Sequence, residues 1–480
     1  MYSGAAAVSL AQVAEQACVF ARNIVLARLL GPDNMGVAAT LAVTLSALEM
    51  TSNLAADRLL LQAKDGDEPG LQAAAQLVEA LRGILCAVLI FALAGPIAGL
   101  FGVPEATGAY RWLAVVPILR GLVHLDAKRL VRGHKYAPLI AVDLGSQALA
   151  TAAAWPLARA TGDYTAALWL IIGQVTAYTA ISHLVASRRY SWRMTASAWS
   201  RMLSFGWPLL INGLLMFGIF QGDRLIVGVF YDMTTLGVYS VAFSLAMLPT
   251  MMLARIATTM TLPTLSRSAE NMPQFEKRYR LATSVIVTLA SAYMCLLVAA
   301  GGAIMRSVYG VEYAAGGPLL SVLAGMQALR MLRIVPTIGA MAFGDTQNSM
   351  VANIWRTAAI PLALLTAALG APVLLVAMAG VVGELLANVV SIHRLARRQG
   401  IVVRSSAPGL AVLIGLSGGF ALAQGDPLAP WGPWVQIVGA AAVSALAGVA
   451  TAAALRPVRE ELTTLIARFR AGRTMKVDSA

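Results

Sequence analysis

Long apolar stretches recur from one end of the chain to the other, and a short polar segment separates each from the next. A helix that crosses a bilayer needs about 20 mainly apolar residues, and these stretches have that length. Strands of a membrane β-barrel would be shorter and would alternate apolar with polar residues. The pattern predicts an all-α, polytopic membrane protein with about fourteen transmembrane helices, near residues 5–30, 36–57, 71–100, 108–126, 137–159, 165–187, 204–230, 236–263, 281–306, 316–341, 348–370, 373–393, 406–424 and 432–455.

The polar loops between these stretches alternate in charge. Every second loop is rich in Lys and Arg, apart from a nearly uncharged one at 342–349, and the tail after residue 456 is also basic. The loops between them, such as 31–35 and 231–235, are short and nearly free of both residues. Because cytoplasmic loops carry the excess of Lys and Arg, the alternation predicts an even number of helices with both termini in the cytoplasm.

Composition excludes several other classes of protein. Of the 480 residues, 58% are hydrophobic and 12% charged, whereas a soluble domain carries about 25% charge. The net charge of +13 lies in short loops, so we expect no nucleic-acid partner. No predicted loop is long enough to hold a soluble catalytic domain.

Sequence motifs of enzymes and of cofactor sites are also missing. The chain has no HExxH, P-loop or GxSxG pattern, and these motifs mark metalloproteases, nucleotide-binding proteins and hydrolases. Cys18, Cys86 and Cys295 are scattered within apolar stretches, a spacing that fits neither a disulfide framework nor a zinc site. We therefore expect no catalytic residue, no metal and no cofactor.

A faint internal repeat divides the predicted helices. Residues 22–42 align without a gap to residues 223–243, and in both a short turn is followed by Gly-Val, at Gly36 and Gly237. Transporters often contain repeated halves. Because both segments start on the cytoplasmic side, the repeat is parallel. It predicts an N-terminal lobe of six helices at 1–190 and a C-terminal lobe of six helices at 191–400. An appended pair of helices at 401–456 and a basic cytoplasmic tail at 457–480 follow.

The turn after the first helix carries a family resemblance. Its residues Arg28-Leu29-Leu30-Gly31-Pro32-Asp33-Asn34-Met35-Gly36 resemble the LGP-x-x-x-G signature of polysaccharide-repeat-unit flippases. These belong to the multidrug/oligosaccharidyl-lipid/polysaccharide exporter superfamily, whose arrangement of six, six and two helices is similar to the one predicted for the whole chain. The resemblance implies two lobes around a central cavity. It also implies that undecaprenyl-diphosphate-linked oligosaccharides are flipped to the outer leaflet by alternating access.

Charged residues within the predicted helices are the candidates for the transport site. A charge at the bilayer centre costs about 2.5–3.5 kcal/mol on insertion scales, so charges that persist there commonly face a cavity or each other. A lipid diphosphate is anionic, and arginine suits it because the guanidinium binds two oxygens and stays charged. We therefore expect a cationic cavity in which the substrate contacts Arg22, Arg224, Arg255, Arg330 and Arg333.

Membrane acids are candidates for carrying a coupling ion, because burial favours the protonated form of a carboxylate and so permits proton exchange. The candidates are Asp143, Asp223 and Glu384. In the structural alternative, each arginine pairs with a neighbouring acid and fixes two helices together, and an acid with such a partner would be structural too. Glu79 and Arg82 are expected to form one such pair.

Three further patterns concern single helices. Glu49, Asn53 and Asp57 recur every four residues in the second predicted helix and form a polar stripe along one side. Arg356 lies near the inner end of its helix, where snorkelling to the interface is the simpler interpretation. Prolines inside predicted helices, at residues 117, 156, 208, 249, 336 and 361, can kink them.

The sequence thus favours a flippase in the bacterial inner membrane that serves surface polysaccharide assembly, as O-antigen, capsule or exopolysaccharide. Its expected partners are the lipid-linked oligosaccharide, membrane lipids and, through the resemblance, a polysaccharide polymerase and a chain-length regulator. An ion-coupled multidrug or cation antiporter of the same superfamily is the first alternative, although such proteins need acid-rich cavities. A polytopic polysaccharide polymerase or ligase is the second, and it would need a large outer loop.

Overall fold

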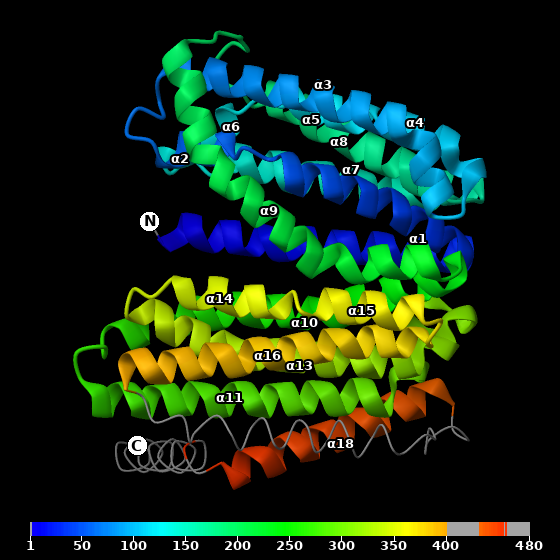
Figure 1. The fold of residues 1–480 in the computed structure, drawn as a ribbon, viewed down its shortest axis with the longest axis vertical. Coiled ribbons are helices and arrows are strands. Elements are labelled where there is room, and N and C mark those ends of the chain that lie inside the picture. Colours follow the sequence, from blue (N-terminus) through cyan, green and yellow to red (C-terminus); the bar gives the residue numbers. More distant parts are fainter. Residues whose placement is uncertain (1, 401–431, 456, 458–480) are drawn as a thin grey trace, which may run out of the picture. The chain divides into compact units, whose positions relative to one another are not determined.

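The computed structural model describes residues 2–400, 432–455 and 457. Within these residues the chain is helical apart from short connections, and it contains no β-strand (Figure 1). The all-α class predicted from the sequence is therefore confirmed for the described part. The predicted helix 406–424 and almost all of the predicted basic tail lie outside the described residues.

The described residues form two compact units, which fall within residues 1–241 and 242–480. The first contains α1 (Tyr2–Ser52), α2 (Ala56–Gln62), α3 (Pro69–Leu100), η1 (Pro104–Ala106), α4 (Thr107–Leu113), α5 (Val115–Gly121), α6 (Asp126–Arg132), α7 (Ala137–Thr161), α8 (Thr165–Leu184), α9 (Ala196–Phe230) and the start of α10 (Met233–Ser266). The second contains the rest of α10 and α11 (Met272–Ala299), α12 (Gly301–Tyr309), η2 (Val311–Gly316), α13 (Gly317–Ala342), α14 (Gln347–Arg356), α15 (Ala359–Ala368), α16 (Val373–Gln399) and α18 (Pro433–Ala454). The lobe boundaries drawn from the repeat stay a prediction.

Among the described residues, eleven helical segments are long and apolar enough to cross a membrane, judged by length and composition. The first of them, Leu10–Ser52, has 43 residues, which makes it roughly 65 Å long at about 1.5 Å per residue. That is about twice the thickness of a hydrocarbon core, so this segment is long enough for the two crossings expected from the sequence. The total of fourteen stays a prediction.

The turn predicted at residues 31–35 is a break inside α1. Gly31 has φ 75° and ψ 172°, outside the helical region, and the helix resumes at Pro32. The Pro32 ring disfavours the helical conformation of the residue before it, and glycine tolerates a positive φ. The motif that carries the family resemblance therefore forms a sharp break between two helical arms.

Prolines also explain why two predicted helices are interrupted. The predicted helix 108–126 is divided into α4 and α5 three residues before Pro117, and the predicted helix 348–370 is divided into α14 and α15 just before Pro361. Each proline lacks the N–H that would bond the carbonyl four residues earlier, and its ring crowds that carbonyl. The kinks expected at these two prolines are confirmed.

The polar stripe predicted for the second helix is wrong. Helix α1 ends at Ser52, and Ala55 adopts a left-handed conformation with φ 52° before α2 begins. Asn53 lies in this connection, where its Oδ1 accepts a hydrogen bond from the Ala55 N–H at 2.6 Å. Asparagine and aspartate side chains compete with helical bonds in this way. Glu49 and Asp57 therefore belong to different helices.

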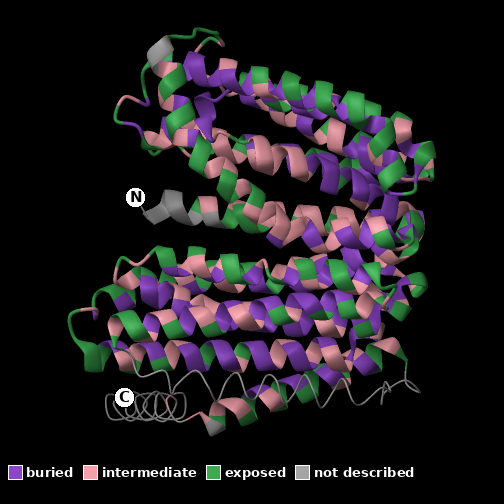
Figure 2. Ribbon diagram, in the orientation of Figure 1, coloured by how far each residue is buried: buried purple, intermediate pink, exposed green. Residues whose placement is uncertain are grey.

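Each unit contains both buried and exposed residues along its helices (Figure 2). Apolar packing holds each unit together, while other apolar side chains remain exposed. In the first unit α7 packs against both α1 and α8, with small side chains such as Ala154 and Ala158 fully buried between them. In the second unit α13 packs against α11 and α16. Helix α3 exposes a row of apolar residues, including Leu81, Ile84 and Leu85, which is the pattern of a helix face in contact with lipid.

Candidate functional site

A polar cavity of about 410 Å³ lies inside the first unit. Side chains from α1, α2, α3, α5, α6, α7 and α8 and from the connections near them line it. Its charged lining residues are four acids and three bases, namely Glu15, Asp57, Glu79, Asp143, Arg82, Arg120 and Lys128. The cavity therefore has mixed charge, and none of the five arginines predicted to bind substrate is among its lining residues.

Two ion pairs fix the wall of this cavity. Arg82 Nη2 lies 2.6 Å from Glu79 Oε2, so the pairing of these two residues predicted from their spacing is confirmed. Arg120 Nη1 on α5 lies 2.5 Å from Glu49 Oε2 on α1. The sequence could not indicate this second pair, because its members are far apart along the chain and meet only through helix packing.

Asp143 is the cavity acid that was predicted to carry a coupling ion. It lies on α7, and the hydroxyl of Tyr178 on α8 forms a hydrogen bond with its carboxylate. The positive charge of Lys128 acts on this carboxylate, but none of the ion pairs among the described residues involves Asp143. A carboxylate in a polar cavity without a paired cation can exchange a proton or bind a cation.

Arg22 on α1 borders the same cavity through two glutamines. Its Nη1 donates to Gln174 Oε1 at 2.8 Å and to Gln147 Oε1 at 3.3 Å, and both glutamines line the cavity. No ion pair of Arg22 occurs in the part of the chain that the structure describes. The structural alternative of a paired acid therefore does not describe this arginine, whose partners are neutral amides.

Asp223 and Arg224 open the second segment of the internal repeat, and they lie on α9 near the start of α10. Asp223 Oδ2 accepts a hydrogen bond from the Tyr239 hydroxyl at 3.2 Å. Arg224 donates to Gln221 Oε1 at 3.3 Å and to the Ser240 carbonyl at 3.4 Å. Arg255 lies further along α10, in the second unit, and is exposed. The predicted substrate-binding residues are thus distributed over both units.

The second unit contains a buried cluster of three arginines and one acid. Glu384 on α16 is fully buried and lies 2.7 Å from Arg330 Nε, 3.3 Å from Arg333 Nε and 2.7 Å from Arg356 Nε. Arg330 and Arg333 come from α13 and Arg356 from α14. We call these four residues the Glu384 cluster. It joins three helices around one carboxylate. Glu384, Arg330 and Arg333 therefore have the arrangement of the structural alternative, in which arginines pair with an acid and fix helices together.

The interpretation of Arg356 as a snorkelling residue is wrong. Its side chain is 6% exposed and paired with Glu384. Its position along α14 suggested an interface residue, but the helix packs against α16, and this packing turns the guanidinium toward a buried carboxylate.

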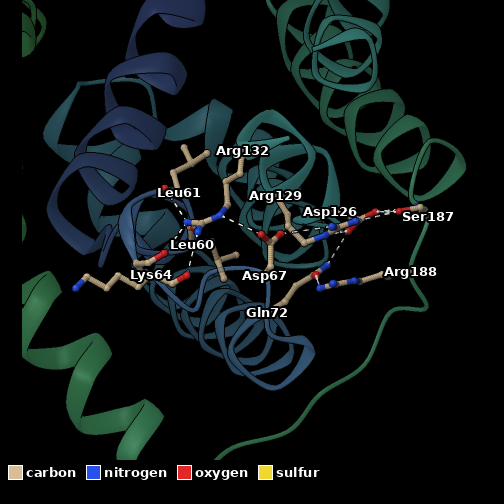
Figure 3. Close-up of polar contacts among 11 residues, drawn as sticks. Leu60, Leu61, Lys64, Asp67, Gln72, Asp126, Arg129, Arg132, Ser187 and Arg188 are labelled. Atoms are coloured by element: carbon tan, nitrogen blue, oxygen red, sulfur yellow. Dashed lines mark hydrogen bonds and ion pairs between the residues drawn. The ribbon is translucent and has the colours of Figure 1, made fainter. Parts of the chain in front are cut away.

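A second polar network joins the basic loops of the first unit at one end of its helices (Figure 3). Asp126 on α6 accepts hydrogen bonds from Arg129 Nε at 2.7 Å and from the N–H and hydroxyl of Ser187, both at 2.8 Å. Burial alone would raise the pKa of Asp126, but these donors outweigh it and lower the pKa to about 2. Arg132 donates to carbonyl oxygens of Leu60, Leu61, Ala63 and Lys64 at the end of α2. The sequence indicated these arginines only as loop charges.

His124 connects this network to the loop after α8. Its Nδ1 accepts the Asp126 N–H at 3.1 Å, and its Nε2 lies 3.0 Å from the Arg188 carbonyl. These contacts require a neutral ring with the proton on Nε2, because a second proton on Nδ1 would face the Asp126 N–H. Burial lowers the pKa of His124, while the charge of Asp126 opposes that change.

Stability should therefore depend on pH through His124. As pH falls below about 6.5, the ordinary pKa of histidine, the unfolded chain takes up a proton that the folded ring excludes. The free energy of unfolding should decrease as pH falls from that value toward the lower folded pKa. Thermal unfolding of the purified protein across this range should show the decrease, and His124→Gln should reduce it. His393→Gln, at an exposed histidine on α16, should leave the pH dependence unchanged, and an equal effect of both variants would contradict this role of His124.

Comparison with known proteins gives a consistent result. The family described as "Polysaccharide biosynthesis protein" matches residues 25–316. A curated relative, the succinoglycan biosynthesis transport protein ExoT of Rhizobium meliloti (strain 1021), is 24% identical over 362 residues, which cover 69% of this chain and 72% of that protein.

Solved structures share the fold. The lipid II flippase MurJ in an inward closed conformation matches with a TM-score of 0.71 and 15% identity, over 93% of this chain and 97% of MurJ. An inward-facing multidrug resistance MATE family transporter of the MOP superfamily matches with a TM-score of 0.60 and 15% identity, over 82% of this chain and 94% of that one. At these identities the likeness is one of fold.

Proposed function

Because this chain belongs to the polysaccharide biosynthesis protein family whose profile covers residues 25–316, we propose that it is a flippase for lipid-linked oligosaccharides. Its substrates are undecaprenyl-diphosphate-linked repeat units. It moves them from the inner to the outer leaflet of a bacterial inner membrane, for assembly of a surface polysaccharide. It works by alternating access and is not an enzyme.

The family and the fold support this proposal together. The chain is a multi-pass membrane protein with the fold of MurJ, which is a lipid II flippase. Its relative ExoT is a succinoglycan transport protein. One name describes a transport protein of polysaccharide biosynthesis and the other a flippase of a lipid.

The observation that carries the proposal is the bonding of Arg22. A half-buried arginine whose partners are two glutamine amides keeps its positive charge uncompensated by an acid. A diphosphate can replace amide oxygens as the acceptor, and charge-assisted bonds between guanidinium and phosphate are about twice as strong as neutral ones. We propose that Arg22, Arg224 and Arg255 bind the diphosphate, with Arg330 and Arg333 as further cationic groups.

Of the three acids, we propose Asp143 as the first candidate to carry a coupling ion, ahead of Asp223 and Glu384. Asp143 lines a cavity and has no paired cation among the described residues, whereas Glu384 lies among three arginines and Asp223 accepts from Tyr239. An ion carrier must bind and release its ion in each cycle, and Asp143 is the only one of these three acids that lines the polar cavity.

The experiment is complementation of a strain that lacks this gene. Arg22→Ala should reduce export of the surface polysaccharide at least tenfold, because it removes a charge-assisted contact of about 1.5–3 kcal/mol. Arg111→Ala is the matched control, since Arg111 is an arginine on α4 near the Phe91 ring and away from the cavity. Amounts of inserted protein should be equal. Normal export by Arg22→Ala, or normal export by the strain without the gene, would contradict the proposal.

The cavity in the first unit favours one second candidate, an ion-coupled antiporter for cationic compounds. Four of its seven charged lining residues are acids, and a MATE transporter shares the fold. This candidate predicts proton- or sodium-driven efflux of cationic dyes from vesicles, with loss of efflux in Asp143→Asn. Efflux without any effect on polysaccharide export would select it over the flippase.

A further inference from the structure

A second, smaller pocket lies in the first unit near the start of α3, and it shares no lining residue with the polar cavity of about 410 Å³ that contains Asp143. Its volume is about 240 Å³. The groups that line it are Pro69, Gln72, Gln76, Arg188, Arg189 and Ser191. They include two guanidinium groups, two amides and a hydroxyl, but no carboxylate. We propose that this pocket, called here the α3 pocket, binds the phosphate group of an anionic ligand.

The start of α3 contributes to this preference for an anion. Helix α3 has 32 residues and begins at Pro69, which lines the pocket. The first N–H groups of a helix have no acceptor within the helix, and they carry the positive end of its dipole. Pro69 has no N–H, and the Gln72 N–H bonds to the Glu68 carbonyl at 3.2 Å, so these lining residues favour an anion through the helix dipole.

Gln76 gives an independent indication of a missing ligand. The residue is 1% exposed, and its Nε2 has no hydrogen-bond acceptor. The buried hydroxyl of Tyr190 lies near Gln76 and Trp192, but it makes no hydrogen bond of ordinary length with either residue. A buried amide donor that is left unsatisfied costs about 1–3 kcal/mol. A phosphate oxygen in the pocket would supply the acceptor that Gln76 lacks.

The loop that carries the arginines is held in place by the network around Asp126. Arg188 Nη1 donates to Gln72 Oε1 at 3.1 Å, and the Arg188 carbonyl lies 3.0 Å from His124 Nε2. The preceding residue, Ser187, donates twice to Asp126 (Figure 3). The guanidinium of Arg188 is therefore positioned before any ligand arrives, and it keeps further N–H donors for an anion.

Nearby carboxylates do not cancel the positive charge of Arg188 and Arg189 in the pocket. Asp126 is engaged with Arg129 and Ser187, and Glu79 is paired with Arg82. Both acids therefore have their own donors. Glu68, which precedes α3, is exposed to solvent.

Exposed side chains on either side of the loop have the character expected near lipid headgroups. Leu184 just before the loop is 83% exposed, and Trp192 just after it is 52% exposed. Exposed tryptophan beside exposed apolar residues is typical of the boundary between hydrocarbon and water. A phosphodiester of an anionic lipid and a soluble phosphate offer the same oxygens to the α3 pocket, and the experiment distinguishes these two sources.

The test measures binding to the full-length purified protein. Native mass spectrometry would compare phosphatidylglycerol with diacylglycerol, which has the same acyl chains and no phosphate. Thermal unfolding with inorganic phosphate would test the soluble source. The variants are Arg188→Ala with Arg189→Ala, and Gln76→Leu. Arg193→Ala is the matched control, because Arg193 is an exposed arginine of the same loop that does not line the pocket.

We expect phosphatidylglycerol to bind and diacylglycerol not to bind. The double arginine variant should bind at least tenfold more weakly and Gln76→Leu several-fold more weakly, because charge-assisted bonds are lost. Arg193→Ala should stay within twofold of the original protein. Stabilisation by inorganic phosphate that is lost in the same variants would also support the pocket and would identify a soluble ligand.

Three outcomes would overturn the proposal. They are equal binding by the double variant, equal binding of diacylglycerol, and no binding of either phosphate probe. If the double variant does not fold, Arg189→Glu alone decides the matter, because Arg189 is exposed and its reversal of charge should weaken binding without disturbing the Asp126 network. None of these measurements depends on polysaccharide export.

Discussion

Replacing Glu384 with glutamine should lower the free energy of unfolding by about 3–5 kcal/mol, the usual cost of breaking a buried ion pair. Glutamine preserves the shape of the side chain and removes only its charge. Arg330, Arg333 and Arg356 would then lie around a neutral amide, in a unit where Glu384 itself is fully buried. Thermal and denaturant unfolding of the purified protein in detergent would measure the loss.

The chain provides a matched control for this variant. Glu276 pairs with Arg280 at 3.1 Å on α11, and their side chains are 26% and 47% exposed. Exposed pairs of this kind contribute about 0–1 kcal/mol, so Glu276→Gln should change stability very little. Equal losses in the two variants would show that the Glu384 cluster does not hold the second unit together.

A double-mutant cycle would separate the pairwise contribution from the effect of an uncompensated charge. Arg330→Gln combined with Glu384→Gln should cost less than the sum of the single variants, because each single change leaves an opposite charge without its partner. Arg333 also donates to Asn353 Oδ1 at 3.1 Å. The interaction energy between Arg333 and Glu384 in such a cycle should therefore be smaller than that between Arg330 and Glu384.

The sequence predicted the extent of most helices because apolar length is a local property. Helices such as α8 and α16 begin at the residues where the apolar stretches predicted that they would begin. The breaks at Pro117 and Pro361 also followed from local chemistry, since a proline acts on the carbonyl four residues before it. The sequence failed at Asn53, where a short polar side chain bonded to the backbone ended a helix in a region that still had helical periodicity.

Partners of charged residues could not be read from the sequence. Glu384 and Arg330 lie 54 residues apart, and Arg120 and Glu49 lie 71 apart. Spacing along one helix predicts a pair such as Glu79 with Arg82, but it carries no information about which faces of different helices meet. Arg22 shows the same limit, because its glutamine partners are 125 and 152 residues away.

The repeat had a structural consequence that the alignment did not reveal. Gly36 and Gly237 occupy equivalent positions in the two repeats, and they lie against each other's turns within the first unit. A Cβ on Gly36 would lie 1.9 Å from the Met233 carbonyl oxygen, and a Cβ on Gly237 would lie 1.9 Å from the Pro32 carbonyl oxygen. The two backbones therefore approach so closely that neither position has room for a side chain.

Replacing Gly237 with alanine should consequently destabilise the protein by at least about 1–3 kcal/mol, the range for overpacked sites. The obstructing atom belongs to the backbone of Pro32, so it cannot move aside as a flexible side chain would. Valine at the same position should cost more and should also reduce polysaccharide export. Gly99→Ala is the matched control, because a Cβ there meets no atom within 4 Å and alanine in a helix is favoured over glycine by about 0.5–1 kcal/mol. Unfolding measurements should thus give effects of opposite sign for the two glycines, and a Gly237→Ala protein as stable as the original would show that the two turns do not touch.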